Sequence, residues 1–499
     1  MSQFSEFIAS RTGLHFPRER WPDFIRGIDS AARDSGAADA KGFIQWLMSH
    51  PLTKRELEVL ASHLTVGETY FFRDEKSFAA LEEPVLSELI RQRREGGNEK
   101  HLRIWSAGCC TGEEPYSIMI LLNRLIPDLD DWNLTLLATD INLQFLGKAA
   151  SGRYSEWSFR TTPLWIRERY FTKTAEGRFD IDSRIKKRVT FSCLNLVEDI
   201  YPSLLNNTNA MDIIFCRNVL MYFTPEQARK VLHNLHHCLV EGGWLMISPI
   251  EIPQVLPPGF ARINHRETVL YRKDSNRPHI NGASIPGPRT EKPETSFLPP
   301  ADNAKDESVE WLPAADSETR LASDIIDRNA AGALPDPLEQ ARVLYEQGCY
   351  EEATEKLLLT VKGSDNTEAM LLLARNLANS GRLADALVWC ENAVATDKLN
   401  PASHYLLAVI LQEQGQGSDA ITALKRALYL DPDFVPAHFA LGNLLLQQGK
   451  CRESEKHFQN ALSILGKYPQ EDCRQELEGM TAGRLSEIIR SAVAREAML

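Results

Sequence analysis

Long apolar runs, CxxC pairs and an excess of basic residues are all missing from this chain of 499 residues. No apolar run approaches the roughly 20 residues that cross a bilayer, so we expect no membrane insertion. The nine cysteines are odd in number and irregularly spaced, which argues against a zinc site and a disulfide framework. Because the net charge is −12, a nucleic-acid partner is not expected.

The start of the chain also lacks the features of a signal peptide. Residues 1–7 contain neither a basic segment nor the beginning of an apolar one. We therefore expect a cytoplasmic protein whose cysteines remain reduced thiols. A chain of this length is too long for a single hydrophobic core, which predicts two or three domains.

The hydrophobic pattern changes along the chain and predicts its domains. Residues 1–75 repeat apolar positions at helical spacing, which indicates an N-terminal helical subdomain. In residues 76–273, short apolar runs alternate with helical segments, which predicts an α/β domain: a mostly parallel sheet with helices on both faces. Residues 274–335 are rich in proline and polar residues without apolar period, and we expect a flexible, disordered linker there.

Individual elements of the α/β domain can be predicted as well. The strand candidates are residues 102–106, 134–139, 188–193, 211–216 and 243–248. A helix is expected over 225–240, with Thr224 as its N-cap and Gly242 and Gly243 as its end. Two later apolar runs close together in sequence, 261–263 and 268–271, suggest an edge hairpin.

After the linker, small residues recur with a period of 34. Gly381, Gly415 and Gly449 follow this spacing, and so do further small residues: Ala374, Ala408 and Gly442, and Ala393, Ala427 and Ala461. This pattern resembles tetratricopeptide repeats over residues 336–468, an all-α domain with two antiparallel helices per repeat. We expect a capping helix within residues 469–499. An ordinary helical bundle with accidental periodicity is the alternative.

A strand, a glycine turn and a helix follow one another at residues 102–122. The turn contains Gly108 and Gly112, and this order brings the backbone of an α/β sheet close to a nucleotide-like ligand. Asp140 ends the next apolar run, where its carboxylate can accept both hydroxyl protons of a ribose. Together these features predict a nucleoside site at the edge of the sheet.

The segment Thr65–Asp74 fits neither a helix face nor a strand face, because it combines a Glu-Thr pair with three aromatic residues and an arginine. Packing between the helical region and the sheet would explain the aromatic rings, but not Thr69 and Arg73. Further on, a buried strand ends in Arg217 and Asn218, at a place where α/β sheets put ligand contacts.

Histidines and cysteines are clustered, but the clusters do not predict a metal or redox site. His233 and His237 are spaced i, i+4, and without acidic ligands nearby they indicate a solvated helix face. Cys109 and Cys110 lie in the glycine turn, and we expect them to be small packing residues.

Several motifs together resemble the CheR family of chemotaxis-receptor protein-glutamate methyltransferases. They appear in the family's order within residues 1–273: Glu68-Thr-Tyr-Phe-Phe-Arg73, Thr111-Gly-Glu-Glu-Pro-Tyr-Ser117, Asn195-Leu196, and Phe215-Cys-Arg-Asn-Val219 with Tyr222. The C-terminal repeats are similar to those of a subgroup of this family, and the architecture suggests a Wsp-type chemosensory methyltransferase.

The resemblance implies that S-adenosylmethionine is the cofactor and that no metal is needed. It places Thr69 and Arg73 near the methionine end of the cofactor, Asp140 at the ribose, and Asn195 and Leu196 at the adenine. The other implied pocket residues are Gly67, Glu114, Arg217 and Asn218. Arg73 and Tyr222 are the candidate catalytic residues, with Tyr222 near the transferred methyl group.

The resemblance also implies the reaction and the partners. The substrate would be glutamate side chains on the cytoplasmic part of a chemoreceptor, and the products glutamate methyl esters and S-adenosylhomocysteine. The repeats would bind a further protein. A methyltransferase for another substrate, and a catalytically weak scaffold that senses S-adenosylmethionine, are the alternatives.

The sequence departs from the family pattern at three places. Gly67 stands where an asparagine is common, so one side-chain amide is missing. In Ser248–Glu251, only Glu251 matches the family's Gly-His-Ser-Glu. The segment Thr172–Arg178 is short for a loop that captures a receptor tail peptide, so such docking is not expected.

Overall fold

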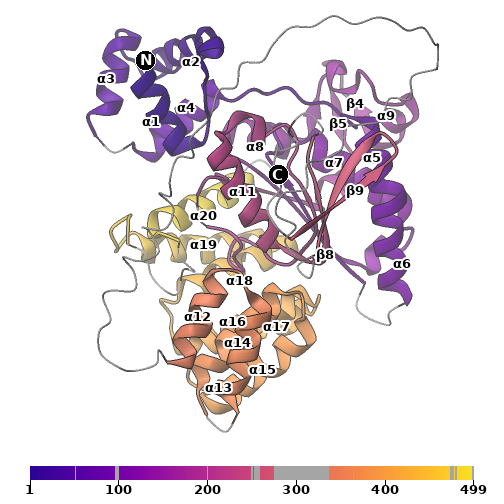
Figure 1. Ribbon diagram of the computed structural model, residues 1–499, viewed down its shortest axis with the longest axis vertical. Helices are drawn as coiled ribbons and strands as arrows, with labels where there is room; N and C mark the ends of the chain where they lie inside the picture. Colours follow the sequence, from indigo (N-terminus) through magenta and orange to yellow (C-terminus); the bar gives the residue numbers. More distant parts are fainter. Residues whose placement is uncertain are drawn as a thin grey trace, which may run out of the picture.

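The computed structural model describes residues 1–50, 52–95, 100–198, 200–248, 251, 259–274, 336–362, 365–472, 477 and 480–496. The predicted linker therefore lies, except for residue 274, outside the described residues. Figure 1 shows the sheet domain with helices on both sides, the N-terminal helices at one end and the repeat helices at the other. No helix of the described part combines the length and apolar character that a membrane span requires.

The N-terminal region is helical, as the periodicity predicts. Its helices are α1 (Ser2–Thr12), α2 (Trp21–Asp34), α3 (Ala40–Met48) and α4 (Lys54–Leu64). They pack around their own core, in which Phe4, Ile8 and Phe24 are almost fully buried. Helices α5 (Glu75–Ala80) and α6 (Ser87–Glu95) then lead to the first strand.

A mixed seven-stranded sheet forms the centre of the molecule, in the order β6-β2-β1-β7-β8-β10-β9. The strands are β1 (His101–Ala107), β2 (Asn133–Asp140), β6 (Val189–Cys193), β7 (Met211–Phe215), β8 (Leu239–Met246), β9 (Phe260–His265) and β10 (Thr268–Lys273). The first five in the sheet order are parallel, and β9 and β10 form an antiparallel edge hairpin. The predicted α/β fold and the edge hairpin are confirmed.

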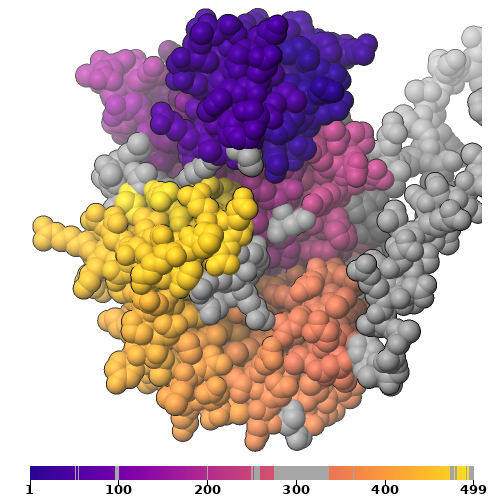
Figure 2. Space-filling view, turned by 90° about the vertical axis from the view of Figure 1, so that its left-hand side faces the viewer, coloured from indigo at the N-terminus to yellow at the C-terminus, as the bar shows by residue number. Residues whose placement is uncertain are grey.

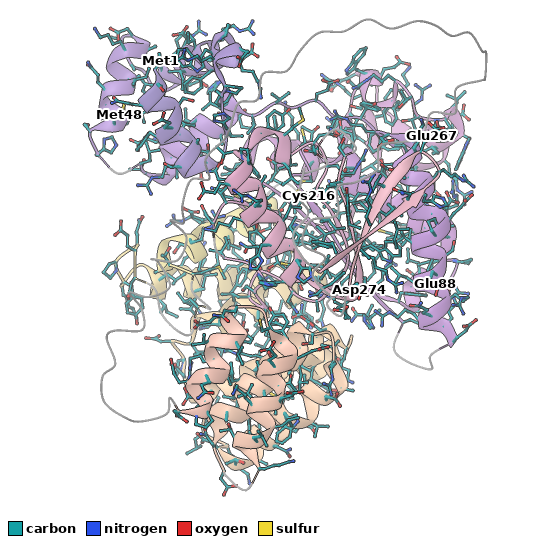
Figure 3. All side chains as sticks on the ribbon, in the orientation of Figure 1. Met1, Met48, Glu88, Cys216, Glu267 and Asp274 are labelled. Carbon is teal, nitrogen blue, oxygen red and sulfur yellow. The ribbon has the colours of Figure 1, made fainter. Side chains whose placement is uncertain are left out.

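Alternate residues of the central strand point to two different cores. Ile104 belongs to the core under α7 (Glu113–Leu125), together with Tyr116, whereas Trp105 packs with Leu232 of α11 (Pro225–Cys238) on the other face. This alternation is the period of two that a strand requires. Near the centre of the molecule, Cys216 directly follows β7 (Figure 3).

Two details of this domain differ from the prediction. Helix α11 ends at Cys238, and Gly242 and Gly243 lie inside β8 instead of ending the helix. The register shifts between the pairs Met211–Leu239 and Ile213–Trp244, so the glycines form a bulge in the strand. The sequence pattern also did not reveal the second sheet, β3-β5-β4, because its strands have only two or three residues.

Four helix pairs form the repeat region. They are α12 (Pro337–Glu346) with α13 (Tyr350–Val361), α14 (Thr367–Asn379) with α15 (Leu383–Thr396), α16 (Pro401–Glu413) with α17 (Gly417–Leu430), and α18 (Val435–Gln447) with α19 (Cys451–Leu465). Gly381, Gly415 and Gly449 turn the chain within a pair at φ between 74° and 78°. Helix α20 (Ala482–Glu496) packs on α19.

The repeats pack against the amino ends of the parallel strands. A Cβ atom on Gly348 would lie 2.5 Å from the His237 ring, and one on Gly381 would lie 2.9 Å from Val240. His237 is therefore an interface residue, and the prediction of a solvated histidine face is wrong at this position. Leu204 and Leu205 of the sheet domain belong to the same buried cluster as the repeat helices.

Candidate functional site

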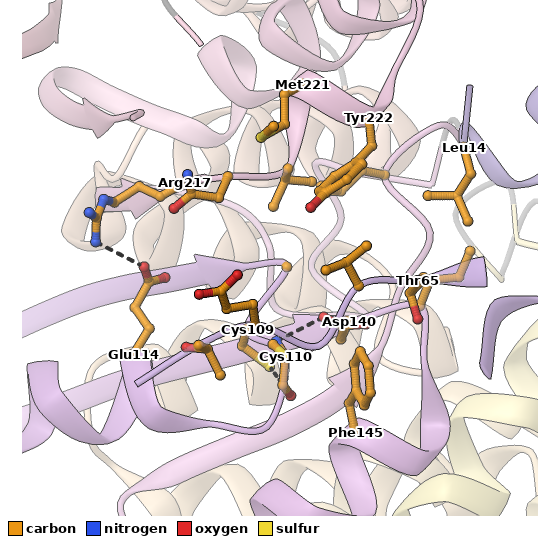
Figure 4. Close-up of a pocket in the computed structure, with 18 of the residues that line it drawn as sticks. Leu14, Thr65, Cys109, Cys110, Glu114, Asp140, Phe145, Arg217, Met221 and Tyr222 are labelled. Atoms are coloured by element: carbon orange, nitrogen blue, oxygen red, sulfur yellow. Dashed lines mark hydrogen bonds and ion pairs between the residues drawn. The ribbon is translucent and has the colours of Figure 1, made fainter. Parts of the chain in front are cut away.

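A cavity of about 300 Å³ lies at the carboxyl ends of β1, β2, β6 and β7. The chain runs from β1 to β2 on one side and later returns to β7 on the other, so the cavity lies where the strand order reverses. In Figure 4, Tyr222 and Met221 form one wall, and Asp140 and Phe145 lie opposite.

The structure brings nine of the ten predicted site residues to this cavity. They are Thr69, Arg73, Glu114, Asp140, Asn195, Leu196, Arg217, Asn218 and Tyr222. Gly67 is the exception, because it lies behind the wall, where a Cβ atom would be 2.8 Å from the ring of Phe145.

The glycine turn after β1 approaches the cavity with its backbone. Gly108 has φ of 80°, and a Cβ atom there would lie 2.3 Å from Val219. The turn also holds Cys110 at φ of 51°, a conformation that is unfavourable for a residue with a side chain. Burial raises the pKa of the Cys110 thiol to about 12, so the thiol stays protonated at neutral pH.

Asp140 is held by backbone groups on both carboxylate oxygens. Oδ2 accepts from the backbone N–H of Cys110 at 2.8 Å, and Oδ1 accepts from that of Asn142 at 2.8 Å. Burial raises the pKa of Asp140 to about 6 despite these hydrogen bonds. Each oxygen of a carboxylate can accept more than one hydrogen bond, so Asp140 retains acceptor capacity for a ligand.

Arg217 ties the end of β7 to the segment that contains Arg73. Its Nη2 lies 3.0 Å from Asp74 Oδ2, while Nη1 donates to the Arg73 carbonyl at 3.0 Å and to Glu114 Oε2 at 3.4 Å. Figure 4 shows the contact between Arg217 and Glu114 as a dashed line. Burial raises the pKa of Glu114, although the nearby Arg217 cation opposes this shift.

Glu251 shapes the turn after β7 rather than reaching into the cavity. Its carboxylate accepts from the backbone N–H groups of Asn218 at 2.6 Å, Met221 at 3.2 Å and Ser248 at 3.2 Å. Asn218 has φ of 59°, so this carboxylate stabilises an unfavourable backbone conformation. Glu251 is the residue of Ser248–Glu251 that matches the family pattern, and it thus has a structural role: it binds the backbone of the turn after β7.

Two cations lie beside Tyr222 at the cavity. The guanidinium of Arg20 is 5.2 Å from the centre of the Tyr222 ring, and Arg73 donates from Nη1 to the Glu68 carbonyl at 2.5 Å. Burial raises the pKa of Tyr222, against the influence of both arginines, so its phenol is protonated at neutral pH.

Several wall residues were missed by the sequence analysis because they lie far from the motifs. Thr12 and Leu14 come from the N-terminal region, and Phe145 is on α8 (Leu143–Ser151). Thr65 and Asp74 are the two ends of the segment Thr65–Asp74, but nothing in the sequence assigns a role to either; Asp74 is a partner of Arg217.

The cavity suits an adenosyl ligand with a zwitterionic tail. Asp140 offers carboxylate oxygens to hydroxyl groups, while Glu114, Arg73 and Arg217 gather charges of both signs at another part of the wall. Opposite charges in one buried place favour a ligand that carries both an ammonium and a carboxylate group. The residues present therefore fit S-adenosylmethionine.

Comparisons with known proteins agree with this site. A model of the CheR methyltransferase SAM-binding domain matches residues 67–252, and a model of the TPR repeat matches residues 411–449. A probable chemotaxis protein methyltransferase of Rhizobium etli is 36% identical over 208 residues, which are 41% of this chain and 75% of the relative.

Two further relatives extend the comparison. Chemotaxis protein methyltransferase 2 of Vibrio cholerae is 30% identical over 271 residues, which are 54% of this chain and 91% of the relative. The probable biofilm formation methyltransferase WspC of Pseudomonas aeruginosa is 32% identical over 223 residues, covering 45% of this chain and 50% of the relative.

Proposed function

We propose that this chain, which belongs to the CheR family of methyltransferases, methylates glutamate side chains on the cytoplasmic part of a chemoreceptor. The cosubstrate is S-adenosylmethionine, and the products are glutamate methyl esters and S-adenosylhomocysteine. The observation that carries this proposal is the cavity at the carboxyl edge of the sheet, where Asp140, Glu114, Arg73 and Arg217 meet. The proposal places the protein in the cytoplasm, with its repeats bound to a further protein.

The reaction requires little chemistry from the protein. When bound, S-adenosylmethionine supplies a methyl group that its sulfonium already activates. A glutamate side chain has a pKa near 4.3, so it is a carboxylate at neutral pH and needs no general base. A carboxylate oxygen forms the new C–O bond while the S–CH3 bond breaks and its electron pair stays on sulfur.

The protein therefore contributes orientation and exclusion of water. Arg73 and Tyr222 are the proposed catalytic residues, because both line the cavity and neither carries a negative charge that would repel a carboxylate. The Arg73 cation attracts the substrate, and the protonated Tyr222 phenol can donate a hydrogen bond to it. Neither residue acts as a nucleophile.

The test is transfer of a radiolabelled methyl group from S-adenosylmethionine to the cytoplasmic fragment of a chemoreceptor. We expect label on the receptor that mild base releases, as methyl esters require. Arg73→Ala should lose most of this transfer, whereas Arg91→Ala, at an exposed position on α6, should retain it. Absence of transfer from the wild-type chain to every receptor fragment tried, with intact cofactor binding, would contradict the receptor as substrate.

A further inference from the structure

The C-terminal helix α20 lies beside the cofactor cavity although it is the last described element of the chain. It packs on α19 of the repeats and also on β6, the edge strand of the sheet. Leu485 and Ile489 are buried in the repeat core. In Figure 2, the C-terminal segment (yellow) lies between the N-terminal helices (indigo) and the repeats (orange). A change in the repeats can therefore reach the edge of the sheet through this helix.

Arg484 makes the polar contact between α20 and the sheet domain. Its Nε lies 3.4 Å from Glu198 Oε2, and Nη2 donates to the Cys193 carbonyl at 3.4 Å. A third contact joins Nη1 to Glu487 Oε2 on the same helix at 2.7 Å. The Arg484 side chain is only 14% exposed, so its charge is held between two carboxylates at the interface.

Glu198 also contacts Asn195, and so it connects Arg484 to the wall of the cavity. Its second oxygen, Oε1, accepts from Asn195 Nδ2 at 3.3 Å. The same nitrogen donates to the Arg11 carbonyl of α1 at 3.0 Å, so both of its protons have partners. Asn195 is 6% exposed and lines the cavity. Its oxygen, Oδ1, also accepts from the backbone N–H of Val197 at 3.4 Å. The plane of the amide is therefore set by α1, by Val197 and by Glu198.

We infer that Arg484 is a positioning residue of the cofactor site, which it orders through Glu198 and Asn195. This inference rests on the proposed function, because it assumes that the cavity binds S-adenosylmethionine. The Glu198 side chain is 37% exposed, so without the arginine it can turn to water and leave Asn195 with one partner fewer. The C-terminal helix thus contributes to cofactor affinity without touching the cofactor.

Calorimetric binding of S-adenosylhomocysteine to the full chain tests this inference. We expect Arg484→Gln to weaken binding about fivefold to tenfold, a typical size for coupling between sites. Arg484→Lys should recover part of this loss, since it restores the charge. In transfer assays the KM for S-adenosylmethionine should rise while kcat changes little. Arg490→Gln, an exposed position on the same helix, should bind like the wild type.

A second variant keeps the test independent of α20 folding. Glu198→Ala removes the middle residue, and combined with Arg484→Gln it should weaken binding no more than either change alone, since both act through one contact. A lower unfolding temperature with unchanged affinity in both variants would overturn the inference and leave a structural contact. Failure of the wild-type chain to bind would instead overturn the proposed function, and the inference with it.

Discussion

The two ends of the parallel strands contain similar residues but use them differently. At the amino ends, the Arg103 side chain is 6% exposed and reaches Asn207 Oδ1 at 2.6 Å and Glu413 of the repeats at 3.6 Å. Asn209 donates to the same Glu413 oxygen at 3.0 Å. At the carboxyl ends, Asp140 is also buried, but its hydrogen-bond partners are backbone groups.

This difference distinguishes Arg103, whose charge is paired within the fold, from Asp140, whose carboxylate remains available to a ligand. A buried charge that faces an opposite charge is stabilised by it, and removing one partner is costly. A carboxylate held only by backbone N–H groups keeps a raised pKa and can still accept hydrogen bonds from a ligand. Arg103 variants should therefore change mainly stability, and Asp140 variants should change mainly binding.

Removing the Asp140 carboxylate should have the largest effect. Asp140→Ala loses two hydrogen bonds that the ribose hydroxyls would donate to a charged acceptor, at about 1.5–3 kcal/mol each, so affinity should fall at least a hundredfold. The unfolding temperature should fall moderately, because the backbone N–H groups of Cys110 and Asn142 lose their acceptor while the unfavourable burial of the carboxylate also disappears. Calorimetry with S-adenosylhomocysteine measures this, with Asp180→Ala on the second sheet as the control. Wild-type affinity in the folded variant would contradict the assignment.

At the amino ends, Arg103→Met should affect stability instead. The change leaves Glu413 buried without its cation, which costs about 3–5 kcal/mol for a buried pair. Urea unfolding should show the loss, while cofactor affinity remains near that of the wild type. Adding Glu413→Gln should recover part of the stability, because a neutral amide then replaces the buried carboxylate that lacks its cation. If Arg103→Met weakens cofactor binding as strongly as Asp140→Ala, the two ends of the strands do not have separate roles in stability and binding.

The sequence was sufficient to predict the features that are determined by residues near one another along the chain. The strand before Gly108, the turn itself and the carboxylate of Asp140 follow from spacing and residue type, and the helix cap at Thr224 is present as predicted. The alternation of strands and helices also predicts a mostly parallel sheet with helices on both faces, but not the order of its strands. These features depend on neighbours within about 40 residues along the chain.

Features that join distant segments could not be predicted. Nothing near Glu251 indicates that it binds the backbone of Asn218, and the period of the repeats does not show that Glu413 faces Arg103. The bulge in β8 was also missed, because two glycines after a helix normally indicate its end. In each case the partner is set by tertiary packing, which a single sequence does not contain.

The raised pKa of Asp140 predicts a pH dependence of binding. Ribose hydroxyls require the ionised carboxylate, so affinity should be constant above pH 7 and fall about tenfold per pH unit well below pH 6. Stability should respond in the opposite direction. A carboxyl whose folded pKa lies above its unfolded value stabilises the fold fully at low pH and loses that contribution as pH rises through about 6. Affinity measured from pH 5 to 8 tests this, and a flat profile would contradict it.

The smallest effect is expected at Gly67, behind the cavity wall. A Cβ atom there would lie 2.8 Å from Phe145 Cζ, so Gly67→Asn must displace this ring, which lines the cavity. Because Phe145 lines the cavity, its displacement in either direction changes the wall, and we expect cofactor binding to weaken about threefold to tenfold, as for modest overpacking. Phe145→Leu removes the end of the ring, and in the double variant it should restore most of the affinity. If Gly67→Asn binds the cofactor more tightly than the wild type, the added amide contacts the cofactor directly. The glycine would then mean that a cofactor contact is missing, and not that Phe145 needs the space.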